Sequence, residues 1–172
     1  GLNNYSRTII EADSEGKPQN VTNGGPTTEM GWEIYPKGIY DVLTRLHREY
    51  GVQNLYVTEN GGAFPDVLLH DGRVEDRDRI DYLHSYLGSV TDTDRIAYLD
   101  GHIAAVRSAA AAGVPVRGYF VWSLLDNFEW AYGYSRRFGL LYVDYSTLER
   151  VPKSSFYWYR DLIGAGQLPE PA

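Results

Sequence analysis

Two hydrophobic periods alternate along the chain and predict alternating helices and strands. Helical spacing first links apolar positions in the segment that begins at Pro36, a residue suited to a first helical turn. Those positions are Ile39, Val42, Leu43 and Leu46. The apolar run Leu-Tyr-Val over 55–57 is then typical of a strand buried on both faces, and Gly61-Gly62 indicates the turn that ends it.

Similar patterns predict the rest of the chain. Residues 1–10 are expected to form a strand, and the polar stretch 11–31, rich in Gly, Pro and Asn, a long surface loop. Helical patterning over 77–112 stops at Gly113-Val114-Pro115. The remaining expected elements are a buried strand that starts at Val116, a Gly- and aromatic-rich loop, a hairpin-like stretch over 139–153 and a last helix over 154–163.

The order of these elements predicts an α/β fold in which helical crossovers join parallel strands through right-handed connections. Three strands make an incomplete sheet, because a free-standing parallel layer of this size would leave long exposed edges and one poorly covered face. We therefore expect residues 1–172 to form a single partial unit of a larger α/β body.

A local duplication interrupts this plan. GRVEDRDRIDYLHSYL over 72–87 is followed at once by GSVTDTDRIAYLDGHI over 88–103, with matching Gly, Val, Asp, Arg, Ile, Tyr and Leu positions. Two copies are too few for a solenoid, which needs at least about three. We interpret 72–103 as one copy that starts the crossover helix and one that adds a helical turn or hairpin outside it. A partner-binding appendage is the weaker alternative.

Composition and charge narrow the function. The content of 43% hydrophobic residues is globular, and 15 Tyr and 4 Trp suit either a site that stacks flat ligands or a large packed core. A net charge of −7 argues against nucleic acid and anionic membranes as partners, and no apolar run is long enough for a membrane span. The absence of cysteine excludes disulfides and thiolate metal sites. The histidines show no metal-ligand spacing and are interpreted as surface or packing residues: His47, His70, His84 and His102.

Glu59 is the first candidate for chemistry. In NLYVTENGGAF it lies at the C-terminal end of a predicted buried strand, where α/β folds often carry their active sites. An acid that merely faces water or caps the turn is an equally good interpretation of this stretch by itself.

Five motifs resemble glycoside hydrolase family 1, the β-glucosidase family. They are GLNNYS, MGWEIYPKGIY, YVTENGGAF, DRIDYL and GVPVRGYFVWSLLDNFEWAYGYSRRFGLLYVDY, and they occur in the family's order over nearly the whole chain. The resemblance implies the C-terminal part, about the last three βα units, of a (β/α)8 TIM barrel.

The resemblance implies roles for residues at the strand ends. Glu59 matches the family's catalytic nucleophile, Tyr5 the tyrosine that hydrogen-bonds this nucleophile, and Asn3 a further pocket residue. A nucleophilic carboxylate must stay ionised, which explains a hydrogen-bond donor beside it. For Tyr5, core packing is the alternative interpretation.

The same resemblance implies a sugar-binding set. Glu129 and Trp130 match the pair that binds sugar hydroxyls, and the related enzymes for 6-phosphosugars replace this pair, so an unphosphorylated sugar is expected. Trp122 matches the platform under the sugar ring, Trp32 the aromatic on the aglycone side, and Phe138 an aromatic close to the sugar. Core or loop packing is the alternative for these three aromatic side chains.

Several positions depart from the family pattern. Asn4 and Tyr132 stand where the family usually has Tyr and Glu. The T-x-N-E-P motif that carries the family's acid/base glutamate does not occur in the sequence, nor do the family's N-terminal Gln, its His-Trp pair and its supporting Arg. The chain thus holds one half of the catalytic pair.

We expect a retaining β-glucosidase or a fragment of one, inactive by itself, whose partners are a β-glucoside substrate and the missing N-terminal part of the barrel. The alternative is a catalytically inactive barrel fragment that binds sugar or self-associates. A nucleotide-binding α/β protein fares poorly, since neither GxGxxG nor a Walker pattern occurs. No cofactor or metal is expected, and the motifs and lack of cysteine suggest a cytoplasmic, bacterial-like location.

Overall fold

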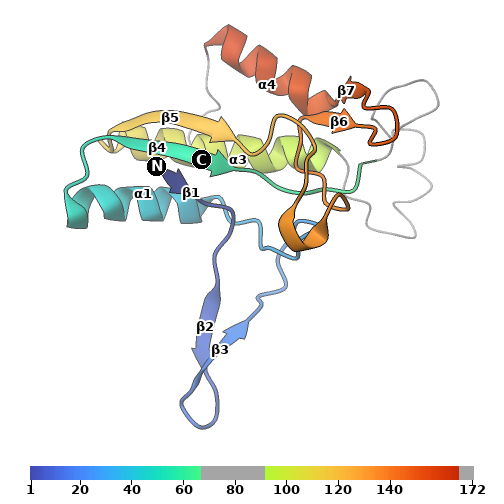
Figure 1. Cartoon of the computed structure of the whole chain (residues 1–172). Helices are drawn as coiled ribbons and strands as arrows, with labels where there is room; N and C mark the ends of the chain where they lie inside the picture. The colour runs from blue at the N-terminus through green and yellow to red at the C-terminus, as the bar shows by residue number, and fades with distance from the viewer. Residues whose placement is uncertain (67–91, 167–172) are drawn as a thin grey trace.

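A three-stranded parallel sheet forms the centre of the computed structural model, which describes residues 1–66 and 92–166 (Figure 1). Strand β4 (Leu55–Asn60) lies between β1 (Leu2–Asn3) and β5 (Val116–Val121). Both pairings are parallel, and the register places Asn3 opposite Glu59. The predicted parallel strands with helical crossovers are therefore confirmed.

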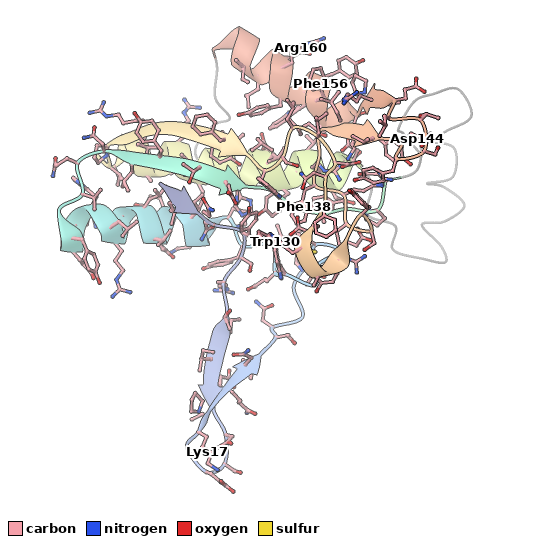
Figure 2. The ribbon with its side chains drawn as sticks, viewed as in Figure 1. Lys17, Trp130, Phe138, Asp144, Phe156 and Arg160 are labelled. Atoms are coloured by element: carbon pink, nitrogen blue, oxygen red, sulfur yellow. The ribbon has the colours of Figure 1, made fainter. Side chains whose placement is uncertain are left out.

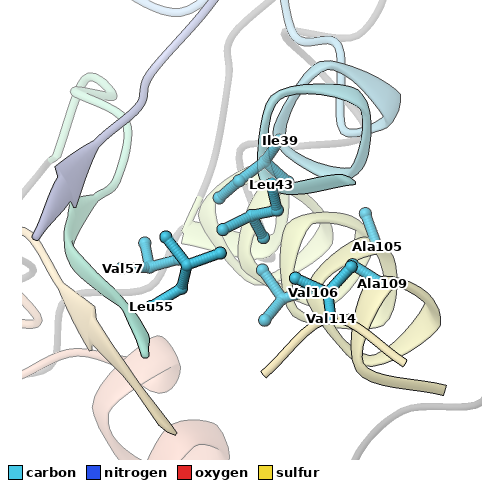
Figure 3. Packing of buried hydrophobic residues seen from close by; sticks show 8 residues of the cluster. All are labelled: Ile39, Leu43, Leu55, Val57, Ala105, Val106, Ala109 and Val114. Carbon is cyan, nitrogen blue, oxygen red and sulfur yellow. The ribbon is translucent and has the colours of Figure 1, made fainter. Parts of the chain in front are cut away.

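Two helices cover one face of this sheet. Helix α1 (Lys37–Tyr50) begins directly after Pro36, as predicted, and ends at Gly51, whose φ of 66° favours glycine. Helix α3 (Asp92–Ala111) ends before the predicted stop residues. Figure 3 shows the core that both helices form with the sheet. Its buried members are Ile39, Leu43, Leu55, Val57, Ala105, Val106, Ala109 and Val114.

A second apolar cluster joins helix α4 (Ser154–Ala165) to the N-terminal half of α3. Its buried residues are Phe64, Tyr98, Leu99, Ile103 and Leu140. Ahead of α4, β6 (Leu141–Val143) and β7 (Arg150–Pro152) pair as an antiparallel hairpin, which confirms the hairpin-like stretch and the last helix.

The opposite face of the sheet lies open. Tyr56 on β4 is 44% exposed and Phe120 on β5 is 56% exposed, while their strand neighbours Leu55 and Val57 are buried. Side chains alternate between the two faces of a strand, and parallel sheets are normally covered on both. Nothing in 1–66 and 92–166 covers this second face.

The prediction for the N-terminal 31 residues was partly wrong. The first strand ends at Asn3, and the expected loop contains an antiparallel hairpin of β2 (Ile9–Ala12) and β3 (Pro18–Val21), which projects from the body of the molecule (Figure 1). Its turn is held by Asp13, whose carboxylate accepts backbone N–H bonds from Glu15 and Lys17 at 2.8 and 2.9 Å. Pattern analysis missed the hairpin because both strands are largely polar and exposed.

Two earlier predictions fall partly outside the described residues. The helix expected over 77–112 is described only from Asp92, and of the duplication at 72–103 only residues 92–103, in α3, are described. None of the helices in the described ranges is long and apolar enough to cross a membrane.

Candidate active site

Tyr5 and Glu59 meet at the carboxyl ends of neighbouring strands. The backbone N–H of Asn4 donates to the carbonyl of Glu59 at 3.0 Å, which extends the β1–β4 pairing by one residue. Just beyond it, the Tyr5 hydroxyl donates a hydrogen bond of 2.6 Å to Oε2 of Glu59. The carboxyl ends of parallel strands are where α/β proteins place their ligands.

The Tyr5 phenol stays protonated at ordinary pH. Burial is the main cause that raises its pKa, and the hydrogen bond to Glu59 and the negative charges of Glu59 and Glu129 raise the pKa further. A phenol in this position remains a donor, which is what an ionised carboxylate requires beside it.

An aromatic cluster surrounds the Tyr5 ring. The ring centroid of Trp32 lies 5.4 Å from that of Tyr5, and the centroid of Phe138 lies 6.4 Å away in an edge-on arrangement. Trp32 and Phe138 also contact one another, at 6.2 Å. Phe138 is only 3% exposed, so these contacts fix its position firmly. Residues far apart in the sequence thus form one wall beside Glu59.

Close backbone packing explains why the strand before Glu59 ends in glycines. The N–H of Trp122 donates to the carbonyl of Asn60 at 2.8 Å, which brings the end of β5 against the end of β4. A Cβ atom on Gly61 would lie 1.7 Å from the carbonyl oxygen of Trp122. Only glycine fits there.

Glu129 lies in the loop after β5, half-buried, at the start of the 3-10 turn η1 (Trp130–Tyr132). Burial raises the pKa of its carboxyl group, a hydrogen bond from the Trp122 side chain lowers it, and the charge of Glu59 raises it. This electrostatic coupling links Glu129 and Trp122 to the Tyr5–Glu59 pair.

Two predicted site residues are less enclosed. Trp130 is 82% exposed and has a φ of 43°. Figure 2 shows it below Phe138, on the loop beyond the end of the sheet. Asn3 is exposed, and its Oδ1 accepts a hydrogen bond of 2.7 Å from the Thr58 hydroxyl. The described residues therefore form one side of a site and leave Trp130 facing solvent.

Asn60 and Tyr98 support the site from beneath, and sequence reasoning missed this role. The fully buried Asn60 amide donates to the carbonyl of Asn4 at 2.7 Å and to the Tyr98 hydroxyl at 3.1 Å, and it accepts from the Tyr119 hydroxyl. The Tyr98 hydroxyl in turn donates to the carbonyl of Tyr5 at 2.9 Å. The asparagine that follows Glu59 in T-E-N-G was the available signal.

A buried ion-pair network connects the two site loops and was also missed. The Lys153 ammonium lies 2.5 Å from Asp66 in the loop after β4 and 3.0 Å from Asp126 in the loop after β5. Arg95 pairs with the other side of Asp66 at 3.0 Å, and Arg137, next to Phe138, pairs with Asp126 at 2.7 Å. Acids and bases from four segments thus fix these loops to one another.

Within the described ranges, no group of three or more His, Asp or Glu side chains is arranged to hold a metal ion. The chemistry of the site therefore has to be sought in its carboxylates and aromatic side chains.

The sequence matches the family model for glycosyl hydrolase family 1 over residues 2–91 and 87–167. Beta-glucosidase A of Thermotoga maritima is 47% identical over 165 residues, which cover 95% of this chain and 33% of the relative. A bifunctional beta-D-glucosidase/beta-D-fucosidase of Bifidobacterium breve is 45% identical over 182 residues, which cover 95% of this chain and 36% of the relative.

Solved structures give the same result. The T. maritima family 1 β-glucosidase in complex with isofagomine lactam matches with a TM-score of 0.82 at 47% identity, over 95% of this chain and 33% of that one. Its complex with glucoimidazole matches with a TM-score of 0.83, over 97% and 34%. The chain spans about a third of the length of these relatives. The predicted fold, part of a (β/α)8 barrel, is thereby confirmed, and the chain belongs to glycosyl hydrolase family 1.

Proposed function

We propose that the chain supplies the nucleophile side of the active site of a retaining β-glucosidase, with Glu59 as the nucleophile. The observation that carries this proposal is the 2.6 Å hydrogen bond from Tyr5 to Glu59 at adjacent strand ends. The names of the relatives, which include Beta-glucosidase A, support the reaction class.

Glu59 begins the reaction by attacking the anomeric carbon of a β-glucoside. With Oε2 held by Tyr5, we assign the attack to Oε1 of Glu59. A bond from this oxygen to the anomeric carbon forms as the glycosidic C–O bond breaks, and the leaving oxygen takes a proton from a second carboxylic acid. Water then attacks the same carbon, gives up a proton to that second residue and releases Glu59.

The remaining site residues hold the sugar. In this proposal Glu129 accepts hydrogen bonds from sugar hydroxyls with Trp130 beside it, Trp122 lies under the ring, and Asn3 contacts a hydroxyl. Trp32 and Phe138 line the wall next to Tyr5. The carboxylate of Glu129 would repel a phosphate, so the pair Glu129-Trp130 supports an unphosphorylated sugar.

The second carboxylic acid must come from outside this sequence, since the acid/base motif does not occur in it. In retaining glycosidases it lies about 5–5.5 Å from the nucleophile. We therefore propose that the chain alone has no measurable turnover and that an N-terminal barrel part completes the site. Loss of the general acid alone lowers rates by a factor of roughly 10²–10⁴.

Self-association without turnover is the second candidate, and the open sheet face favours it. Tyr56 and Phe120 expose apolar area on a parallel sheet that has two unpaired edges, β1 and β5. A second copy of the chain could cover this surface.

Reconstitution separates the two candidates. The chain would be produced alone and together with the N-terminal region of T. maritima Beta-glucosidase A that it does not match. Native mass spectrometry and an aryl β-glucoside assay would then be applied to the same fraction. Turnover that requires the added region and is lost in Glu59→Gln supports the nucleophile proposal. A homo-oligomer without turnover in either preparation supports the second candidate.

A further inference from the structure

A cavity of about 450 Å³ lies at the base of the β2–β3 hairpin, where its two arms separate. Its volume falls within the range of about 300–1,000 Å³ that is typical of small-molecule sites. All of its lining residues lie between Ser6 and Glu33, so the cavity is complete within this chain. The polar and aromatic side chains among them include Arg7, Thr8, Asn20, Asn23, Trp32 and Glu33.

The charged groups of this cavity neutralise one another. Arg7 binds Glu33 through two hydrogen bonds, from Nε to Oε2 at 2.7 Å and from Nη2 to Oε1 at 2.9 Å. The Asn23 amide donates a third bond to Glu33, of 2.6 Å. A fixed pair of this kind offers no uncompensated charge to select a phosphate or a carboxylate. The cavity therefore favours a neutral ligand.

The remaining lining groups suit a carbohydrate. The Asn20 amide and the Thr8 hydroxyl can each donate and accept hydrogen bonds, as sugar hydroxyls do. The Trp32 ring provides the flat apolar surface on which the C–H face of a sugar packs. Peptides and nucleotides would leave either the ring or the polar groups poorly used.

Trp32 joins this cavity to the catalytic carboxylate. It lines the cavity, and it also contacts the Tyr5 ring at 5.4 Å, while Tyr5 bonds Glu59. A chain of sugars that reaches the cavity would thus pass over Trp32 after leaving the Glu59 site. One aromatic side chain separates the two places.

We propose that the cavity at the hairpin base is a distal subsite that binds a sugar unit beyond the bond to be cleaved, so that the enzyme prefers β-linked oligosaccharides to short glucosides. This proposal rests on the proposed function for its place in the substrate. Its binding chemistry can be measured without turnover, because the cavity belongs wholly to this chain.

The test is binding of cellotetraose and of methyl β-D-glucoside to the full chain, measured by calorimetry and tryptophan fluorescence. Asn20→Ala removes a lining amide, and Gln19→Ala on the same strand is the matched control, since neighbouring side chains point to opposite faces. Thr8→Trp, which fills the cavity, is the second variant. Circular dichroism checks that each variant is folded.

We expect the chain to bind cellotetraose at least about tenfold more tightly than methyl β-D-glucoside. Asn20→Ala should weaken cellotetraose binding roughly threefold to tenfold, the value of one neutral hydrogen bond, and Thr8→Trp should weaken it more. Gln19→Ala should bind like the original chain. Failure to bind cellotetraose, or equal binding by Asn20→Ala and Thr8→Trp, would overturn the distal subsite.

Glu59→Gln separates this proposal from the proposed function. We expect this variant to bind cellotetraose as the original chain does, because Glu59 does not line the cavity. Such binding, together with a reconstituted enzyme that does not need Glu59, would leave the subsite standing and overturn the nucleophile assignment. Turnover that needs Glu59, with cellotetraose and methyl β-D-glucoside bound equally, would do the reverse.

Discussion

The Tyr5 hydroxyl lies 2.6 Å from Oε2 of Glu59, although 54 positions separate the two residues in the sequence. The contact joins the carboxyl ends of β1 and β4, so the orientation of the carboxylate depends on the pairing of these two strands. Asn60 and Tyr98 reinforce it by holding the backbone on which Tyr5 lies. The nucleophile that we propose is thus positioned by the sheet rather than by a loop.

Replacing Tyr5 by Phe should lower activity with little loss of stability. The variant keeps the aromatic packing against Trp32 and Phe138 and removes only the donor to Glu59. A hydrogen bond to a charged group contributes about 1.5–3 kcal/mol, so we expect kcat/KM of the reconstituted enzyme to fall roughly 10- to 100-fold. Tyr50→Phe, at an exposed position at the end of α1, is the control and should retain full activity. Equal activity of both variants would show that the Tyr5 hydroxyl does not serve the nucleophile.

Gly61→Ala should destabilise the chain by about 1–3 kcal/mol or more, because its Cβ would meet the carbonyl oxygen of Trp122 and force the ends of β4 and β5 apart. Gly164→Ala is the matched substitution in α4, where a Cβ has open space. It should stabilise the chain by up to about 1 kcal/mol. Urea unfolding of the two variants measures both effects, and a stability of Gly61→Ala at or above that of Gly164→Ala would refute the close approach.

Lys153→Met should be strongly destabilising. The fully buried ammonium bonds Asp66, Asp126 and the carbonyl of Gly139, and its removal leaves two buried carboxylates with less compensation. Breaking a buried ion pair from one side costs about 3–5 kcal/mol.

Lys37→Met provides the comparison for this change. Lys37 pairs with Asp41 on the exposed surface of α1, and such pairs contribute no more than about 1 kcal/mol. The free energies of unfolding from denaturant titration should differ between the two variants by several kcal/mol. A loss at Lys153 no larger than the loss at Lys37 would mean that the buried network does not hold the loops together.

His102 should make the chain sensitive to mild acid. It is fully buried and stacked on Tyr98, its Nδ1 lies 2.7 Å from the Tyr98 carbonyl, and its Nε2 has no hydrogen-bond partner in 1–66 and 92–166. Burial lowers the pKa of His102 to about 4 from its usual 6.5, and the backbone contact opposes this in part. The neutral imidazole is therefore the form that the folded state favours.

The sign of the pH effect follows from this lowered pKa. Between pH 6.5 and 4 the unfolded chain takes up a proton at His102 and the folded chain does not, so stability is complete above pH 6.5 and declines towards pH 4. The decline from this residue amounts to roughly 3 kcal/mol. His102→Gln should remove it, as measured by the free energy of unfolding at several pH values. The same acid dependence in both proteins would show that His102 does not titrate as described.

The main elements were predictable because their patterns are local. The spacing of Ile39, Leu43 and Leu46 fixed α1, and the apolar run before Glu59 fixed β4. The β2–β3 hairpin was missed because it packs little apolar surface and depends on the turn at Asp13. Hydrophobic periodicity does not report such exposed polar strands.

The site was less predictable than the fold. The family resemblance placed Tyr5 beside Glu59, and the structure brings these two together, but the residues alone left core packing open for Tyr5. The network around Lys153 gave no sequence signal, because its members come from segments far apart and meet only after folding. The exposure of Trp130 was not foreseen either, since its surroundings depend on chain that these 172 residues do not include.

Trapping the covalent intermediate tests the central claim most directly. The chain, reconstituted with the N-terminal region of T. maritima Beta-glucosidase A, would be treated with a 2-deoxy-2-fluoro-β-glucoside that carries a good leaving group. The fluorine slows hydrolysis of the glycosyl-enzyme more than its formation, so the intermediate accumulates. We expect peptide mass mapping to find one sugar on the peptide that contains Glu59, and none in Glu59→Gln. A sugar on any other carboxylate, or turnover that persists in Glu59→Gln, would contradict the assignment.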